Sequence, residues 1–176
     1  MLSNNKNSSG EKKKKKNSAK RPVSQDGMRL RLADLCSRSE QCESDLRMKI
    51  TRAGLSKEEG DQIIDFLKTN RFLDNARFAR AYARDKLRFA GWGRNKIRAG
   101  LYAKGIAADD IKAGLDAIEE GDYIEAMLKT GRAKASRLDL HTRTDAAKFI
   151  RHMQSRGFES GLIFQLLDAL RMDAGD

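Results

Sequence analysis

The stretch IRAGLYAKGIAADDIKAGLDAI, residues 97–118, contains the pattern that decides the fold. Ile97 and Leu101 are four residues apart, so they lie on one face of a short helix. Gly105 follows, and glycine readily adopts the left-handed conformation that ends a helix. Apolar residues at one, ten and thirteen positions after this glycine continue the pattern. The stretch therefore predicts two helices joined by a glycine turn.

The same pattern occurs three times along the chain. Gly54, Gly105 and Gly157 are 51 and 52 residues apart, and the same five positions around each glycine are apolar. The fifteen residues are Leu46, Ile50, Leu55, Ile64, Leu67, Ile97, Leu101, Ile106, Leu115, Ile118, Phe149, Met153, Phe158, Leu167 and Leu170. Hydrophobic residues make up only 39% of the chain, so chance does not explain this agreement. We infer an internal repeat of about 50 residues.

The composition favours helices throughout these repeats. Pro22 is the only proline, so no proline interrupts the chain beyond it. Ala, Leu, Arg, Lys and Asp are abundant, whereas β-branched residues are scarce. Ser56 and Glu59 form a capping-box pattern at the start of one expected helix. We predict an all-α fold, an elongated tandem array of three-helix, helix-turn-helix-like repeats.

The expected domains follow from the repeat. A Lys-rich tail precedes two complete repeats, each closed by a third helix, and the last repeat is truncated because the chain ends before a third helix. These four segments are residues 1–27, 28–90, 91–136 and 137–176. The tail has too few apolar residues to offset the cost of ordering, so we predict that it is disordered.

The charge is strongly positive. The chain carries a net charge of +11, to which the tail contributes eight basic and two acidic residues. A basic protein tends to meet nucleic acid or acidic protein surfaces. The run Lys12–Lys16 could hold phosphates without sequence preference, or it could simply keep the tail solvated.

The motifs of common enzymes are missing from the sequence. There is no GxxxxGK[ST], HExxH, GxSxG or CxxC motif, so we expect no catalytic residue, metal or cofactor, and no enzyme activity. Cys36 and Cys42 are expected to be free thiols. No apolar run is long enough to span a membrane, and no signal-peptide pattern is present, so we expect a cytoplasmic protein.

Basic residues near the middle of the chain form the candidate interface. Arg77, Arg80, Arg84 and Arg88 follow steps of three and four, which places them in one stripe on a helix. The full candidate set for contacts to a partner or to nucleic acid is Arg77, Arg80, Arg84, Lys86, Arg88, Arg94, Lys96, Arg98 and Lys104. Such a stripe suits phosphates or an acidic groove, but it could equally be the solvated face of a basic protein.

The only tryptophan lies between two glycines, in the segment Gly91, Trp92 and Gly93. We interpret this segment as the joint between the first and second repeats. Trp92 is expected to be a packing anchor that sets the angle between modules. The alternative is that it stacks on a base or inserts into a partner.

Residues 72–106, FLDNARFARAYARDKLRFAGWGRNKIRAGLYAKGI, resemble the central signature of the RecX family of recombination regulators. The residues that agree with it are Leu73, Asp74, Arg77, Phe78, Ala79, Tyr82, Gly91, Gly93, Ile97, Leu101, Lys104, Gly105 and Ile106. Flanking stretches at residues 45–55 and 149–167 also resemble the family, in the same order. Two positions depart from it: Arg94 replaces a usual proline, and Cys42 replaces a usual serine.

The resemblance implies a partner that composition alone does not identify. Members of this family bind the recombinase RecA, chiefly as its filament on single-stranded DNA, and lie in the helical groove of that filament. There they block filament growth and damp ATP hydrolysis, strand exchange and coprotease activity. The resemblance thus implies a RecA modulator in DNA repair and the SOS response, with possible direct DNA contact, and we expect the protein to be a monomer. The alternative is a basic helical-repeat protein that binds nucleic acid without a recombinase partner, and a third interpretation is an inert scaffold.

Overall fold

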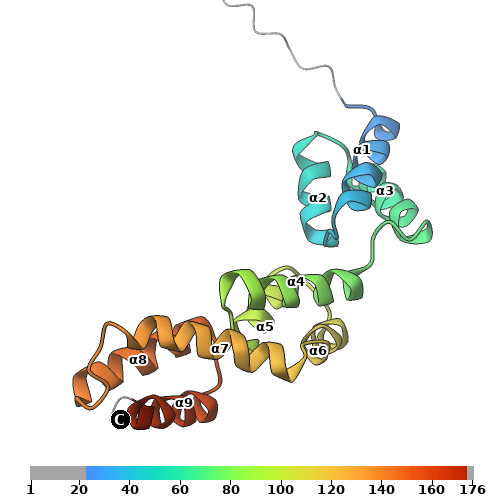
Figure 1. Cartoon of the computed structure of the whole chain (residues 1–176). Coiled ribbons are helices and arrows are strands. Elements are labelled where there is room, and N and C mark those ends of the chain that lie inside the picture. The colour runs from blue at the N-terminus through green and yellow to red at the C-terminus, as the bar shows by residue number, and fades with distance from the viewer. Residues whose placement is uncertain (1–22, 174–176) are drawn as a thin grey trace, which may run out of the picture.

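The computed structural model describes residues 23–173, which form nine α-helices and no strand (Figure 1). The helices are α1 (Gln25–Arg38), α2 (Glu43–Arg52), α3 (Lys57–Thr69), α4 (Asn75–Ala90), α5 (Arg94–Ala103), α6 (Ala108–Asp116), α7 (Glu120–Ala135), α8 (Arg143–Arg156) and α9 (Ser160–Asp173). The predicted all-α repeat fold is confirmed. Residues 1–22 of the predicted disordered tail lie outside the described residues, but the predicted boundary at residue 27 is wrong, because α1 already begins at Gln25.

The helices pack in three groups of three. In the first group, α1 and α2 pack on α3. In the second, α4 and α5 pack on α6. In the third, α8 packs on α7 and α9. We call these groups module 1 (α1–α3), module 2 (α4–α6) and module 3 (α7–α9). The modules follow one another along an elongated molecule, with module 1 and module 3 at opposite ends (Figure 1).

The module boundaries differ from those expected from the sequence. The sequence assigns residues 75–90 to the first repeat, residues 28–90, but α4 packs most closely on α6 and so begins module 2. The reason lies in small residues: Ala79 and Ala83 are fully buried, and a Cβ on Gly114 of α6 would lie 2.9 Å from the carbonyl carbon of Ala79. The third repeat is consequently complete, because α7 supplies its first helix.

The glycine turns of the repeat are confirmed. Gly54, Gly105 and Gly157 have φ angles of 83°, 72° and 86°, in the left-handed region that ends a helix. Thirteen of the fifteen repeat positions are buried, and only Leu55 and Leu170 are partly exposed. The capping box predicted at the start of α3 is also present. Local sequence therefore dictates each helix–turn–helix unit.

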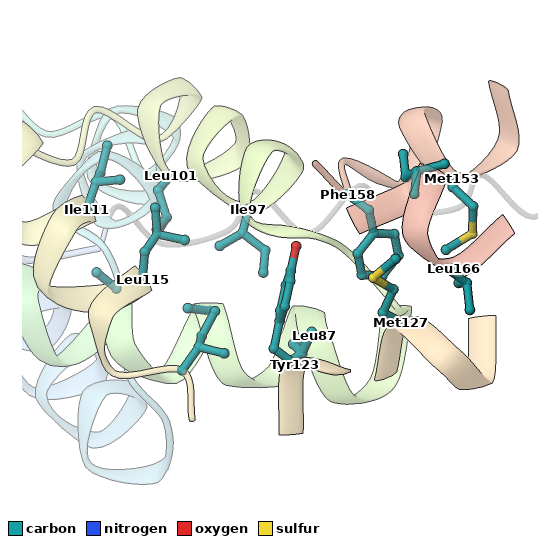
Figure 2. Packing of buried hydrophobic residues seen from close by; sticks show 14 of the residues in the cluster. Leu87, Ile97, Leu101, Ile111, Leu115, Tyr123, Met127, Met153, Phe158 and Leu166 are labelled. Carbon is teal, nitrogen blue, oxygen red and sulfur yellow. The ribbon is translucent and has the colours of Figure 1, made fainter. Parts of the chain in front are cut away.

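The buried residues form two separate clusters. One is the core of module 1 and contains residues such as Leu46, Ile63 and Leu67. The other runs through modules 2 and 3 without a break, and Cys42 of module 1 also joins it. Figure 2 shows side chains from α4–α9 in this shared core, with the hydroxyl of Tyr123 pointing up between Ile97 and Phe158. Modules 2 and 3 are therefore joined by continuous apolar packing.

Candidate partner interface

The arginine stripe lies on α4, but its members differ in their surroundings. Asp74 caps the helix, since its carboxylate accepts a hydrogen bond from the backbone N–H of Arg77 at 2.9 Å. Arg80, Arg84 and Arg88 are exposed and form no salt bridge in the described structure. These three guanidinium groups are available to a partner.

Arg77 has a structural role instead. Its Nε donates to a carboxylate oxygen of Glu40 at 2.9 Å, and its Nη2 donates to the carbonyl of Arg71 at 3.0 Å. Glu40 belongs to the segment between α1 and α2, whereas Arg77 belongs to α4. Arg77 therefore ties module 2 to module 1, and its side chain is already occupied.

Lys104 makes a second contact between these modules. Its Nζ lies 2.7 Å from Oδ2 of Asp45, and the hydroxyl of Ser44 donates to its carbonyl at 2.7 Å. The hydrogen bond to Asp45 raises the pKa of the Lys104 ammonium, so it stays charged. Burial alone would raise the pKa of the Asp45 carboxyl, but the hydrogen bonds to Lys104 and Cys42, together with the charges of Lys104 and Lys49, outweigh burial and lower that pKa.

Trp92 is half-buried against the shared core, and two ammonium groups lie near its ring. The Nζ atoms of Lys86 and Lys96 lie 5.1 Å and 4.9 Å from the centre of its ring, a geometry typical of cation–π contacts. Lys96 also donates to the carbonyl of Ser155 at 3.0 Å. This surrounding favours the packing-anchor interpretation of Trp92; its effect on partner contact stays a prediction.

The segment Gly91–Gly93 is not the joint between the first two modules. It connects α4 to α5 inside module 2, and the linker from module 1 is residues 70–74 instead. The segment meets module 3: the N–H of Gly93 donates to the carbonyl of Arg156 at 2.8 Å. A Cβ on Gly93 would overlap the Gly157 carbonyl and lie 2.5 Å from the nitrogen of Phe158. Only glycine fits this close approach of two backbones.

Arg94 adds side-chain contacts to the same place. Its guanidinium lies 3.9 Å from the centre of the Tyr123 ring and 2.6 Å from Oε2 of Glu120, and its side chain is only 23% exposed. The hydroxyl of Tyr123 accepts from the Arg94 N–H at 3.3 Å and donates to Glu159. Burial and the bond to Glu159 raise the pKa of Tyr123 far above its usual range, so it stays a donor.

The nine candidate residues therefore fall into three groups: residues that contact another module, one that contacts aromatic rings, and exposed residues. Arg77, Arg94, Lys96 and Lys104 bind neighbouring modules, and Lys86 lies against aromatic rings. Arg80, Arg84, Arg88 and Arg98 are exposed, and within residues 23–173 the only side-chain hydrogen bond of Arg98 is to nearby Asn95. Arg98 lines a cavity of about 680 Å³ between α5 and α6, away from α4's stripe.

Sequence reasoning missed a groove beside the stripe. Two adjoining cavities of about 360 and 530 Å³ lie between α4 and α7, and they share Leu87, Arg88, Ala126 and Lys129. We call this feature the α4–α7 groove; its lining cations are Arg84, Arg88, Lys129, Lys134, Arg137 and Arg156. The basic C-terminal half of α7 was a signal in the sequence, but nothing local placed it beside α4.

Other kinds of site find no support in the described residues. Within residues 23–173, no group of three His, Cys, Asp or Glu side chains could hold a metal ion. Over the same range, no helix has the length and apolar character to cross a membrane. Cys36 and Cys42 are both free and buried, in different cores.

These features define an elongated all-α protein built from tandem three-helix modules. Two solved structures share this fold. One, described as a crystal structure of regulatory protein RecX, has a TM-score of 0.72 and 22% identity, and covers 82% of this chain and 71% of its own. RecX from Lactobacillus salivarius also has a TM-score of 0.72, with 16% identity and coverage of 84% and 97%.

Sequence comparison gives the family. The family model for RecX, second three-helix domain, matches residues 74–115, which correspond to module 2. The chain is 32% identical over 131 residues to regulatory protein RecX of Prosthecochloris aestuarii, covering 85% of that protein. It is 31% identical to RecX of Clostridium botulinum strain Alaska E43 but spans only 60% of that relative's length. The chain belongs to the RecX family.

Proposed function

We propose that this chain is a regulatory protein that binds the recombinase RecA, chiefly as its filament on single-stranded DNA, and inhibits filament growth and ATP hydrolysis. The observation that carries the proposal is the similarity over 131 residues to a protein named regulatory protein RecX. The regulation requires no chemistry of its own, so the protein acts by binding and not as an enzyme. A monomer that meets RecA in the cytoplasm, during DNA repair and the SOS response, is part of the same proposal.

The shape and charge of the molecule support this mode of action. An array of three modules exposes a long surface for its mass, as helical-repeat proteins that bind extended partners do. Arg80, Arg84 and Arg88 point cations out of the central module, where they could meet acidic side chains or phosphates in a filament groove. Filament growth would stop wherever the array covers the surface that the next subunit needs.

The proposal is tested by titrating the chain into RecA on single-stranded DNA and measuring ATP hydrolysis. We expect a decrease that saturates as the protein covers the filament, and no change at several-fold excess would contradict the proposal. The variant Arg84→Glu/Arg88→Glu should require a higher concentration, because it reverses two exposed cations. A matched control is Arg31→Glu/Lys57→Glu, which makes the same charge change at exposed positions of module 1.

A second candidate function is a helical-repeat protein that binds nucleic acid without a recombinase partner. The net charge of +11 and the run Lys12–Lys16 support it. Deletion of residues 1–22, which leaves α1 and its N-cap Ser24 in place, distinguishes the two functions. If RecA inhibition persists after the deletion, the regulator is favoured; if all activity is salt-sensitive DNA binding that the deletion abolishes, the second candidate is favoured.

A further inference from the structure

The α4–α7 groove is lined by cationic and apolar residues of both helices. Arg84 and Arg88 line it from α4, and Lys129 and Lys134 line it from α7. Its apolar lining residues include Leu87, Ala90, Ala126 and Ala133. The two cavities share four lining residues, so together they form one extended groove between the helices.

The charge of the groove is not balanced within the described structure. Arg84, Arg88, Lys129, Lys134 and Arg137 form neither a salt bridge nor a side-chain hydrogen bond with any residue from 23 to 173. Cations gathered without partners repel one another, and an anionic ligand would relieve that repulsion.

The positive charge is greatest toward one end. Asp122 and Glu125 line only the Arg84 end, where they offset part of the charge. His152 lines the other end, where burial and the nearby charges of Arg156 and Lys134 lower its pKa. The potential is therefore most positive between Arg88 and Arg137, where cations line the groove and Asp122 and Glu125 do not.

An aromatic ring lies at this positive end. Phe89 lines the cavity and is 78% exposed, which is unusual for a phenylalanine. The guanidinium of Arg88 lies 5.8 Å from the centre of its ring. A cationic groove with an exposed aromatic ring is the combination with which proteins bind single-stranded nucleic acid, since the ring stacks on a base while cations hold the phosphates.

We propose that the α4–α7 groove binds a single strand of nucleic acid directly, with backbone phosphates on Arg88, Lys129, Lys134 and Arg137 and a base stacked on Phe89. A duplex is disfavoured because its bases are paired and stacked, so Phe89 could reach none of them. An acidic protein segment would use the cations but would leave the exposed ring without its aromatic partner. The inference does not depend on RecA, because it concerns contact with the strand itself.

The test measures binding of the full chain, residues 1–176, to a fluorescein-labelled 20-residue oligothymidylate by fluorescence anisotropy at several NaCl concentrations. The variant Lys129→Gln/Lys134→Gln/Arg137→Gln should raise Kd about ten-fold at low salt. It should also reduce the slope of log Kd against log[NaCl] by about 2, since each phosphate contact on a single strand contributes about 0.7. Phe89→Ala should raise Kd at least about five-fold, and Phe89→Trp should restore it, because stacking on a base is worth about 1–3 kcal/mol.

The controls separate the groove from general charge. Arg31→Gln/Arg52→Gln/Lys57→Gln removes the same charge from exposed positions of module 1 and should leave Kd within two-fold of wild type, a margin set by long-range screening. An equal loss in this control would overturn the proposal. Binding of the matching duplex as tightly as the single strand would also overturn it. So would an unchanged Kd for Phe89→Ala together with displacement of the oligonucleotide by poly-glutamate, which would assign the groove to an acidic protein segment.

Discussion

The two contacts between neighbouring modules join the same helix ends by different chemistry. The second helix of each module, α2, α5 or α8, takes part. The C-terminal end of α5 meets the N-terminal end of α2, and the C-terminal end of α8 meets the N-terminal end of α5. In each, the acceptor is the carbonyl of the residue before the repeat glycine. The carbonyl of Lys104 accepts from the Ser44 hydroxyl at 2.7 Å, whereas that of Arg156 accepts from the backbone N–H of Gly93 at 2.8 Å.

One position explains the difference. Cys42 and Gly93 both lie twelve residues before the glycine of their repeat and both cap the helix that follows. The buried side chain of Cys42 fills the contact between modules 1 and 2, so polar side chains must bridge it. Gly93 has no side chain, so two backbones meet directly between modules 2 and 3. The first contact depends on ion pairs, and the second on close backbone fit and a shared core.

The largest expected effect comes from adding one methyl group at Gly93. Gly93→Ala should lower the free energy of unfolding by about 3 kcal/mol, the upper end of the usual cost of overpacking, because the neighbour is backbone and cannot rotate away. Urea denaturation measures it. The matched control is Gly121→Ala in α7, where no atom lies within 4 Å of the new Cβ; this variant should be as stable as wild type or slightly more. Equal stability of the two variants would show that modules 2 and 3 are not joined as described.

The next effect concerns the hydroxyl at the same contact. Tyr123→Phe removes the donor to Glu159 and the acceptor for the Arg94 N–H, while the ring stays in the core. We expect a loss of about 1–2 kcal/mol, since the remaining groups are only partly solvated. A double-mutant cycle with Glu159→Gln measures the coupling. If the two substitutions were strictly additive, the hydroxyl would contribute nothing through Glu159.

The helices could be predicted from the sequence, but their grouping could not. The glycine turns and the apolar positions around them are local features, and Gly54, Gly105 and Gly157 all adopt the expected conformation. Whether α4 closes module 1 or begins module 2 depends on its contact with α6 through Ala79 and Gly114. Alanine and glycine contribute little to the hydrophobic periodicity of a sequence, so the module to which α4 belongs could not be predicted.

The candidate site shows the same limit. Sequence spacing correctly located a basic stripe, but it could not show that Arg77 and Arg94 have acidic partners 37 and 26 residues away. Phe89 and Lys129 were missed for a related reason: the α4–α7 groove exists only because two helices from different modules lie side by side. Charge can be read from a sequence, whereas its neutralisation depends on the fold.

A smaller effect is expected at the contact between modules 1 and 2. Lys104 and Asp45 are 29% and 35% exposed, so their ion pair should contribute only about 0.2–1 kcal/mol, and Lys104→Met should cost no more than this. The loss should shrink in 1 M NaCl, where charges are screened, whereas the loss in Gly93→Ala should not. Thermal denaturation at low and high salt measures both. A salt-independent loss in Lys104→Met would mean that the contact depends on packing of the lysine stem.

The smallest expected effect is a dependence on pH that separates the two contacts. His152 lies one turn before Arg156, whose guanidinium donates to the Ala90 carbonyl between modules 2 and 3 at 2.9 Å. Burial, Arg156 and Lys134 lower the pKa of His152, so the unfolded chain binds its proton first as the pH falls. Stability from this group is therefore complete above about pH 6.5 and declines below it.

The lowered pKa of Asp45 acts in a separate pH window, since the stability that Asp45 contributes is complete above about pH 4 and is lost only below that value. Melting temperatures from pH 7.5 to 5.0 should show a small decline in wild type and in Asp45→Asn, and a flatter profile in His152→Gln. If Asp45→Asn alone flattened the profile, the pH-sensitive contact would be the one between modules 1 and 2.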